Sequence, residues 1–196
     1  MTVFGDIALV SLGSNAPGGQ TAATSFVLKG SLRLAETSGV FDVVTSDLFD
    51  TPAYPAGIGP DFVNAAMAFR TTLPADALLD VLHGIEAEAE RTRDLRWGQR
   101  TLDLDLLALG DLVVPDVATQ TRWRDLDPVA QRQEAPDRLI LPHPRLQDRA
   151  FVLVPLAQVA PDWVHPVTGQ SVLQMRDALP RADVAAVRVR DRAKGT

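Results

Sequence analysis

Residues 101–109 read Thr101-Leu102-Asp103-Leu104-Asp105-Leu106-Leu107-Ala108-Leu109, an alternation of polar and apolar residues typical of a β-strand. Successive side chains of a strand point to opposite faces, so Asp103 and Asp105 share one face and the leucines between them share the other. Their Cα atoms are then about 6.6 Å apart. Two carboxylates at that spacing can converge on one Mg²⁺ or bridge a pair of ions, and hard oxygen ligands suit Mg²⁺. The alternative is a half-buried strand with a solvated acidic face.

Four arginines precede this strand within ten residues, in a loop that also contains Gly98 and Trp97. They are Arg91, Arg93, Arg96 and Arg100. Guanidinium groups bind phosphate oxygens. A cation held by two carboxylates also binds phosphate, so the arginines and the aspartates can act on the same anion. The alternative is a solvated connection whose arginines pair with nearby glutamates and aspartates, but arginines, an aromatic ring and paired aspartates together favour a phosphate site.

Further strands and helices are predicted outward from this stretch. Apolar or β-branched runs predict strands at residues 7–12, 40–49 and 62–72. Helical spacing predicts helices at about 20–36, from Pro74 to about 89, and at 150–160. The proline- and glycine-rich residues 51–60 form a loop, Gly110-Asp111 suggests a tight hairpin into residues 112–114, and residues 115–138 are expected to be irregular.

The order strand, helix, strand, strand, helix, strand is that of a ferredoxin-like split βαβ unit. We therefore expect an α+β fold, a ferredoxin-like α/β sandwich of antiparallel sheet with helices packed on it. Residues 1–196 are expected to form a single domain with an irregular excursion at about 115–138. Fold order alone says nothing about chemistry.

The composition narrows the classes of function. The chain has 196 residues, of which 46% are hydrophobic and 22% charged, so it is expected to be globular. It has no cysteine, which removes disulfides, thiolate metal sites and cysteine nucleophiles. Its formal charge of −6 argues against general nucleic-acid binding. No apolar run approaches the roughly 18 residues of a membrane span, so we expect a cytoplasmic protein that binds no membrane.

Four ordered blocks of the sequence resemble one known family. The most specific, Arg96-Trp97-Gly98-Gln99-Arg100-Thr101-Leu102-Asp103-Leu104-Asp105, looks like the signature of hydroxymethyldihydropterin pyrophosphokinase, an enzyme of folate biosynthesis. The other blocks are Leu12–Asn15, Thr51–Ala66 and Leu141–Leu156. The resemblance runs from about residue 7 to residue 166, with 115–138 unmatched.

The resemblance implies a reaction and a role for each matching residue. The family transfers pyrophosphate from ATP to the hydroxymethyl oxygen of a reduced pterin and releases AMP, so ATP as co-substrate, the pterin and two Mg²⁺ ions are the implied ligands. We expect a monomer. The implied metal ligands are Asp103 and Asp105; the catalytic residues are Arg91 and Arg100; ATP contacts are His83, Glu86, Arg93, Trp97, Arg100, His143 and Arg149; and pterin contacts are Thr51, Ala53, Phe62, Asn64 and Phe151.

Without the resemblance, each of these residues has a structural explanation. Phe62 and Phe151 are ordinary core candidates, His143 is a loop histidine, and Glu86 belongs to a solvated helix face. The alternative function is a non-catalytic ferredoxin-like module that binds a nucleotide or a protein partner. The Asp103 and Asp105 pair separates the two, because a binding module does not need two metal carboxylates aimed at one anion.

Overall fold

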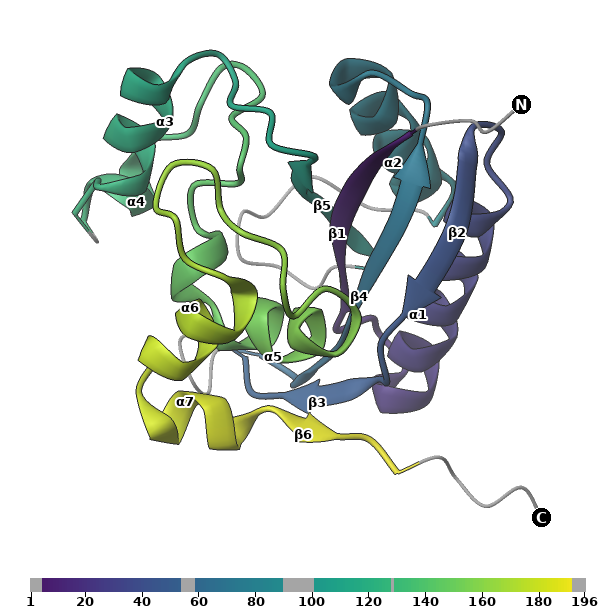
Figure 1. Ribbon diagram of the computed structural model, residues 1–196. Coiled ribbons are helices and arrows are strands. Elements are labelled where there is room, and N and C mark those ends of the chain that lie inside the picture. Colours follow the sequence, from purple (N-terminus) through teal and green to yellow (C-terminus); the bar gives the residue numbers. More distant parts are fainter. Residues whose placement is uncertain (1–4, 54–58, 90–100, 128, 192–196) are drawn as a thin grey trace.

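An antiparallel sheet with helices on both faces forms the body of the protein (Figure 1). The computed structural model describes residues 5–53, 59–89, 101–127 and 129–191. The strands are β1 (Asp6–Ser14), β2 (Val40–Thr45), β3 (Phe49–Thr51), β4 (Phe62–Thr71), β5 (Asp103–Leu109) and β6 (Arg188–Val189). The α-helices are α1 (Gly19–Ala35), α2 (Ala75–Glu88), α3 (Val117–Arg124), α4 (Ala130–Gln133), α5 (Ala150–Val159), α6 (Val172–Ala178) and α7 (Arg181–Ala186), with a short 3₁₀ helix, η1, at Leu146–Asp148.

The sheet order is that of the expected ferredoxin-like unit. β1 lies between β4 and β5, and the far edge of β4 is shared by β2 and β3. Every strand pair among the described residues is antiparallel. The predicted α+β fold is therefore confirmed.

Helices α1 and α2 cover one face of the sheet. Each helix buries an apolar stripe, through Val27 and Leu34 on α1 and through Leu78 and Leu82 on α2. The stripes pack against the alternate strand residues Ala8, Val10, Leu12, Val63, Ala65, Met67, Leu104 and Leu106. This cluster is the main core, and burying apolar surface of this kind stabilises a fold by about 25 cal/mol per Å².

Helices α5 and α6 cover part of the other face. Their buried residues, among them Val152, Leu156 and Met175, pack against Leu9 and Leu107. Helix α5 packs mainly against β4. The residues that continue this face toward the end of β1 are polar or small, and they form the candidate site described below.

The predicted strand at residues 40–49 is two strands. β2 ends at Thr45 and β3 begins at Phe49. At the break, the Ser46 hydroxyl accepts a hydrogen bond from the Ala66 N–H at 2.9 Å, and the Ser46 N–H donates to the Ala66 carbonyl. A serine side chain thus replaces a regular ladder contact, which an apolar pattern does not reveal.

The predicted hairpin at residues 110–114 is wrong. Gly110 makes the expected turn, with a φ of 54°, and its N–H donates to the Ile7 carbonyl. The chain then leaves the sheet, and Val114 forms an isolated bridge with Leu141 instead of pairing with β5.

The predicted irregular segment 115–138 contains helices α3 and α4. Asp116 caps α3 by accepting a hydrogen bond from the Thr119 N–H at 2.9 Å. Gln120 is the only residue of α3 that is buried, and its amide donates to the Pro142 carbonyl. A short polar helix anchored by one glutamine has no apolar period, which is why the sequence did not predict it. Within the described ranges, no helix is long and apolar enough to cross a bilayer.

Candidate active site

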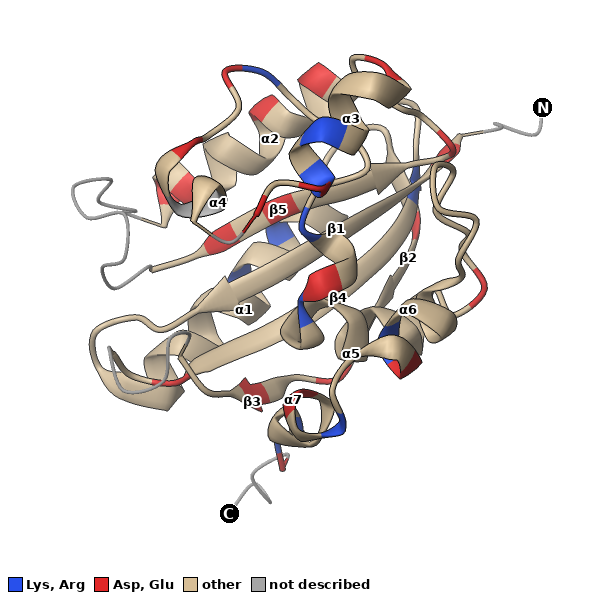
Figure 2. Ribbon diagram, turned by 90° about the vertical axis from the view of Figure 1, so that its left-hand side faces the viewer, with Lys and Arg blue, Asp and Glu red and all other residues tan. Residues whose placement is uncertain are grey.

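A row of residues crosses β5, β1 and β4 on the face that α5 covers only in part. Gly13 of β1 lies opposite Asp103 of β5 on one side and Asn64 of β4 on the other. Ser11 lies opposite Asp105 in the next row. Neighbouring strands are about 4.8 Å apart. Asp103 of β5 and Asn64 of β4 therefore lie on either side of Gly13, whose backbone carries no side chain. Figure 2 shows the acidic residues of β5 in red along the strand.

Gly13 is required by the close approach of its neighbours. A Cβ at this position would lie 2.6 Å from Asn64 Oδ1 and 4.0 Å from Phe62 Cδ1. Asn64 and Phe62 therefore converge over the Gly13 backbone. Gly13 belongs to one of the matching blocks, and the sequence alone indicates no further role for it.

Asn64 is held by the neighbouring strand β3. Its Nδ2 donates a hydrogen bond to Thr51 Oγ1 at 2.6 Å, and both side chains are buried. The register explains the contact, because Thr51 lies opposite Phe62, two residues from Asn64 on the same face. Two predicted pterin residues are thus brought together, and the backbone N–H of a third, Ala53, donates to Asp61 Oδ1 at 3.3 Å.

The two aspartates are half-buried, and one of them pairs with a predicted ATP residue. Arg149 Nη1 lies 3.6 Å from Asp105 Oδ2. Arg149 immediately precedes α5, and its Cζ lies 5.7 Å from the centroid of the Phe151 ring. One guanidinium therefore contacts both a predicted metal ligand and a predicted pterin-stacking ring.

His143 lies in the segment that leads to Arg149. Its N–H donates to the Leu107 carbonyl at 2.8 Å, which fastens this segment to β5. Its Nδ1 accepts a hydrogen bond from the Arg145 N–H at 3.0 Å. Burial, followed by the nearby charges of Arg149 and Arg145, lowers the pKa of His143 to about 3. The imidazole is therefore neutral near pH 7 and carries its proton on Nε2.

Glu86 is buried rather than solvated. Its side chain is 2% exposed, and Oε1 accepts a hydrogen bond from the Leu104 N–H at 2.9 Å. Leu104 lies between Asp103 and Asp105, so Glu86 fixes the backbone that presents the two carboxylates. The expectation of a solvated face applies instead to Glu88, which forms an exposed ion pair with Arg33. His83 is exposed on α2.

The remaining predicted residues, Arg91, Arg93, Trp97 and Arg100, lie outside the described residues. Within the described ranges, no group of three or more His, Asp or Glu side chains is arranged to hold a metal ion. Asp103 and Asp105 form a two-carboxylate set. Such a set fits Mg²⁺, which commonly takes one or two carboxylates and completes its shell with water and substrate phosphates.

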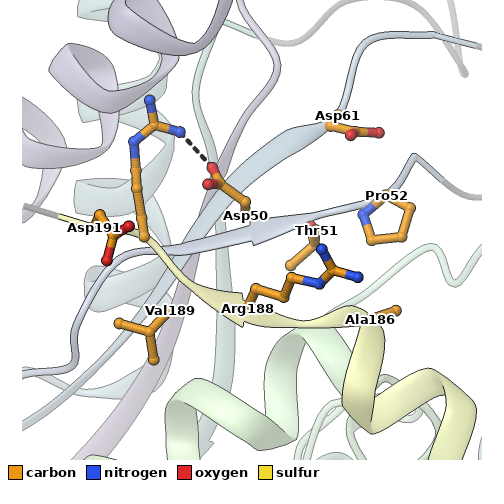
Figure 3. A pocket seen from close by; sticks show the side chains of 9 residues that line it. Asp50, Thr51, Pro52, Asp61, Ala186, Arg188, Val189 and Asp191 are labelled. Carbon is orange, nitrogen blue, oxygen red and sulfur yellow. Dashed lines mark hydrogen bonds and ion pairs between the residues drawn. The ribbon is translucent and has the colours of Figure 1, made fainter.

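A cavity of about 640 Å³ lies beside this face, at the edge formed by β3 and β6 (Figure 3). It does not lie over the aspartates. Its lining includes Thr51 and Asp61 from the pterin segment, Arg188 of the C-terminal strand β6, and Arg190, which follows that strand. The sequence alone does not indicate strand β6, because a two-residue strand leaves no periodic signal.

Comparisons with known proteins agree with the resemblance. A family model for 7,8-dihydro-6-hydroxymethylpterin-pyrophosphokinase (HPPK) matches residues 9–161. A 2-amino-4-hydroxy-6-hydroxymethyldihydropteridine pyrophosphokinase of Methylorubrum extorquens is 37% identical over 92% of this chain and 96% of its own length. Proteins of the same name from Pseudomonas aeruginosa and Synechocystis are 42% and 39% identical, over 76% and 65% of this chain and 76% and 54% of their own lengths.

The fold is also that of solved structures. The crystal structure of Plasmodium falciparum HPPK-DHPS with pterin and p-hydroxybenzoate superposes with a TM-score of 0.60 at 15% identity, covering 89% of this chain and 43% of that one. At this identity the similarity shows the fold alone. The family model and the curated relatives show more: the chain belongs to the HPPK family, the enzymes of folate biosynthesis that transfer pyrophosphate from ATP to hydroxymethyldihydropterin.

Proposed function

We propose that the chain performs this pyrophosphoryl transfer on the sheet face formed by β5, β1 and β4. The observation that carries the proposal is the shared row of Asp103, Gly13 and Asn64. It sets a carboxylate group and a hydrogen-bonding amide on opposite sides of a strip with no side chain. A polyphosphate and a flat heterocycle then meet over Gly13.

Asp103 and Asp105 are proposed to hold two Mg²⁺ ions. Bound there, the ions would neutralise the charge of the triphosphate and of the group being transferred. Glu86 would keep the two carboxylates in register through its hydrogen bond to Leu104. Arg149 contacts Asp105 through one nitrogen and has further N–H donors that can reach phosphate oxygens. Arg91, Arg93 and Arg100 are proposed to contact the phosphates, with Arg91 and Arg100 catalytic, and Trp97 and His83 to contact ATP.

Phe62 and Phe151 are proposed to stack on the two faces of the pterin. Both rings are half-buried, as expected of rings that keep a free surface for a ligand. Offset stacking of aromatic rings is worth about 0.5–1.5 kcal/mol beyond the area buried. Asn64, held by Thr51, and the backbone near Ala53 are proposed to bond the polar edge of the ring.

In the reaction, the hydroxymethyl oxygen of the pterin forms a bond to the β-phosphorus of ATP. The bond between that phosphorus and the oxygen bridging to the α-phosphate breaks, and AMP leaves with the bridging oxygen. The hydroxyl proton is released. His143 is neutral near pH 7, so it can donate a hydrogen bond from Nε2 without adding a positive charge to the site. No covalent enzyme intermediate is required, because positioning and charge stabilisation account for most phosphoryl-type catalysis.

We further propose that the chain acts as a single-domain monomer. The two hydrophobic clusters lie on opposite faces of one sheet, which supports a single domain. Size-exclusion chromatography with light scattering tests this, and a stable dimer mass would overturn it.

The test of the proposed function is AMP formation from ATP, with and without 6-hydroxymethyl-7,8-dihydropterin. Pterin-dependent AMP that appears in step with pterin pyrophosphate supports the proposal. ATP binding without either product, from a folded protein at saturating Mg²⁺, would favour the non-catalytic binding module instead.

A further inference from the structure

The C-terminal strand β6 lies beyond residues 9–161, the part of the chain that the family model matches. It extends the sheet by pairing with β3: Val189 lies opposite Phe49 and Arg188 opposite Asp50. The Arg190 N–H continues the ladder by donating to the Leu48 carbonyl at 2.7 Å. Figure 1 shows β3 and β6 side by side. Strand β3, which carries Thr51, is therefore an internal strand rather than an edge strand.

The Arg190 side chain reaches the segment that leads to the pterin residues. Its Nη1 forms an ion pair with Asp50 and donates to Gln20 Oε1 at 2.8 Å. Gln20, at the start of α1, donates from Nε2 to the Asp61 carbonyl at 2.8 Å. Asp61 Oδ1 in turn accepts a hydrogen bond from the Ala53 N–H at 3.3 Å.

These contacts join both ends of one loop. Asp50 precedes Thr51 and Ala53 at the end of β3, and Asp61 precedes Phe62 at the start of β4. Figure 3 shows Asp50, Thr51, Pro52 and Asp61 around one cavity, with β6 running beneath them. A single guanidinium thus bonds one end of the loop directly and the other through Gln20.

We propose that Arg190 is a positioning residue for pterin binding, acting through Asp50 and through Gln20 and Asp61. The proposal rests on the proposed function, in which Thr51, Ala53, Phe62 and Asn64 contact the pterin. Strand β3 has three residues, and a strand of that length holds its place weakly without partners on both sides. By fixing β3 and Asp61 before the ligand arrives, Arg190 lowers the ordering cost of binding.

The contribution of Arg190 to global stability is small by comparison. Its side chain is 24% exposed and that of Asp50 is 44% exposed, and ion pairs of such exposure add little to the free energy of unfolding. The Arg190 guanidinium bonds Asp50 and Gln20, and neither of these residues belongs to either hydrophobic cluster. Its loss is therefore expected to change pterin binding more than folding.

The experiment compares Arg190→Ala, Arg190→Lys and the control Arg181→Ala in the full chain. Arg181 lies on α7, is exposed, and forms no ion pair among the described residues. Steady-state assays give KM for the pterin, KM for ATP and kcat, and thermal melts give Tm. Arg190→Ala is expected to raise KM for the pterin about 5- to 20-fold, with kcat and KM for ATP within twofold of wild type and Tm nearly unchanged. Arg190→Lys, which keeps the charge beside Asp50, is expected to recover part of the loss, and Arg181→Ala to behave as wild type.

A double variant tests the route. If Arg190 and Gln20 act as one network, Gln20→Ala adds less to the rise in KM for the pterin in an Arg190→Ala background than it does in wild type. Unchanged KM for the pterin in Arg190→Ala would overturn the inference, as would a loss of kcat and of both affinities in proportion to lost stability. An inactive wild-type chain would instead overturn the proposed function, so the two failures are distinguishable.

Discussion

Arg149 contacts both Asp105 of strand β5 and the aromatic ring of Phe151. Its Nη1 lies 3.6 Å from Asp105 Oδ2, and its guanidinium carbon lies 5.7 Å from the centroid of the Phe151 ring. Arg149 precedes the first residue of α5, so the same helix start that positions the arginine also positions Phe151 two residues later. The backbone of residues 149–151 therefore positions groups that are proposed to contact the metal, the phosphates and the pterin.

Replacing Asp105 with Ala is expected to leave folding intact and to lower kcat at least 100-fold. The side chain is half-buried on the face opposite Leu104 and Leu106, so its removal leaves the main core unchanged. AMP formation at saturating Mg²⁺ measures kcat, and denaturant unfolding checks stability. The exposed Asp162 supplies the control Asp162→Ala, expected to act as wild type. Near-normal turnover by folded Asp105→Ala protein would contradict the proposal that Asp105 holds Mg²⁺.

Replacing Gly13 with Ala is expected to weaken pterin binding at least 10-fold. The new Cβ would lie 2.6 Å from Asn64 Oδ1 and would displace the amide from Thr51 or from the ligand. Isothermal titration with the pterin and a non-hydrolysable ATP analogue gives the affinity. Gly84→Ala is the matched control: a Cβ there meets nothing within 4 Å, and alanine in a helix is favoured by about 0.5–1 kcal/mol. Equal pterin affinity in Gly13→Ala and wild type would contradict the proposal that the pterin binds over the Gly13 backbone.

Replacing Phe151 with Ala is expected to reduce pterin affinity sharply while lowering the free energy of unfolding by less than about 2 kcal/mol. The ring is half-buried and only borders the second hydrophobic cluster, so little core volume is lost. Phe69→Ala is the comparison, because Phe69 is 2% exposed and its loss is expected to cost about 3–5 kcal/mol. A large stability loss in Phe151→Ala, with unchanged pterin affinity per folded molecule, would return the ring to the core.

The free energy of unfolding is expected to fall as the pH is lowered from about 6.5 toward 4, in part because of His165. Burial, with a smaller contribution from the charge of Arg124, lowers the pKa of His165 to about 4. Its buried Nδ1 accepts hydrogen bonds from the N–H groups of Val167 and Thr168. Between pH 6.5 and 4 the unfolded chain binds a proton that the folded chain does not, so stability rises with pH in this window and is lost as the pH falls.

The difference between the pKa values of the histidine in the unfolded and folded chain sets the size of this effect. For one such histidine, the free energy of unfolding at pH 5 is expected to be about 2 kcal/mol lower than at pH 8. Urea unfolding at the two pH values measures the difference, and His165→Asn, which keeps an acceptor near the Nδ1 position, is expected to reduce it. A variant with the full wild-type difference would show that His165 does not contribute.

Local patterns in the sequence determined most of the scaffold and the chemical character of the site. The alternation of Leu102 to Leu106 places Asp103 and Asp105 on one face, and the spacing of Leu78, Leu82 and Ile85 predicts α2 within a residue of its start. These signals are strong because an apolar face must be buried over several residues, which leaves a period in the sequence. The resemblance to the HPPK family came from the same local stretches.

Only the tertiary structure decided which residues meet across strands. Gly13 separates Asp103 from Asn64, Glu86 accepts a hydrogen bond from the Leu104 backbone, and Arg190 pairs with Asp50 from a distant part of the chain. Register and side-chain hydrogen bonds set these contacts, and neither leaves a period in the sequence. Helix α3 escaped prediction for the same reason, since one buried glutamine holds it. Periodic burial is a local property that the sequence records, whereas single polar contacts between distant residues exist only once the chain has folded.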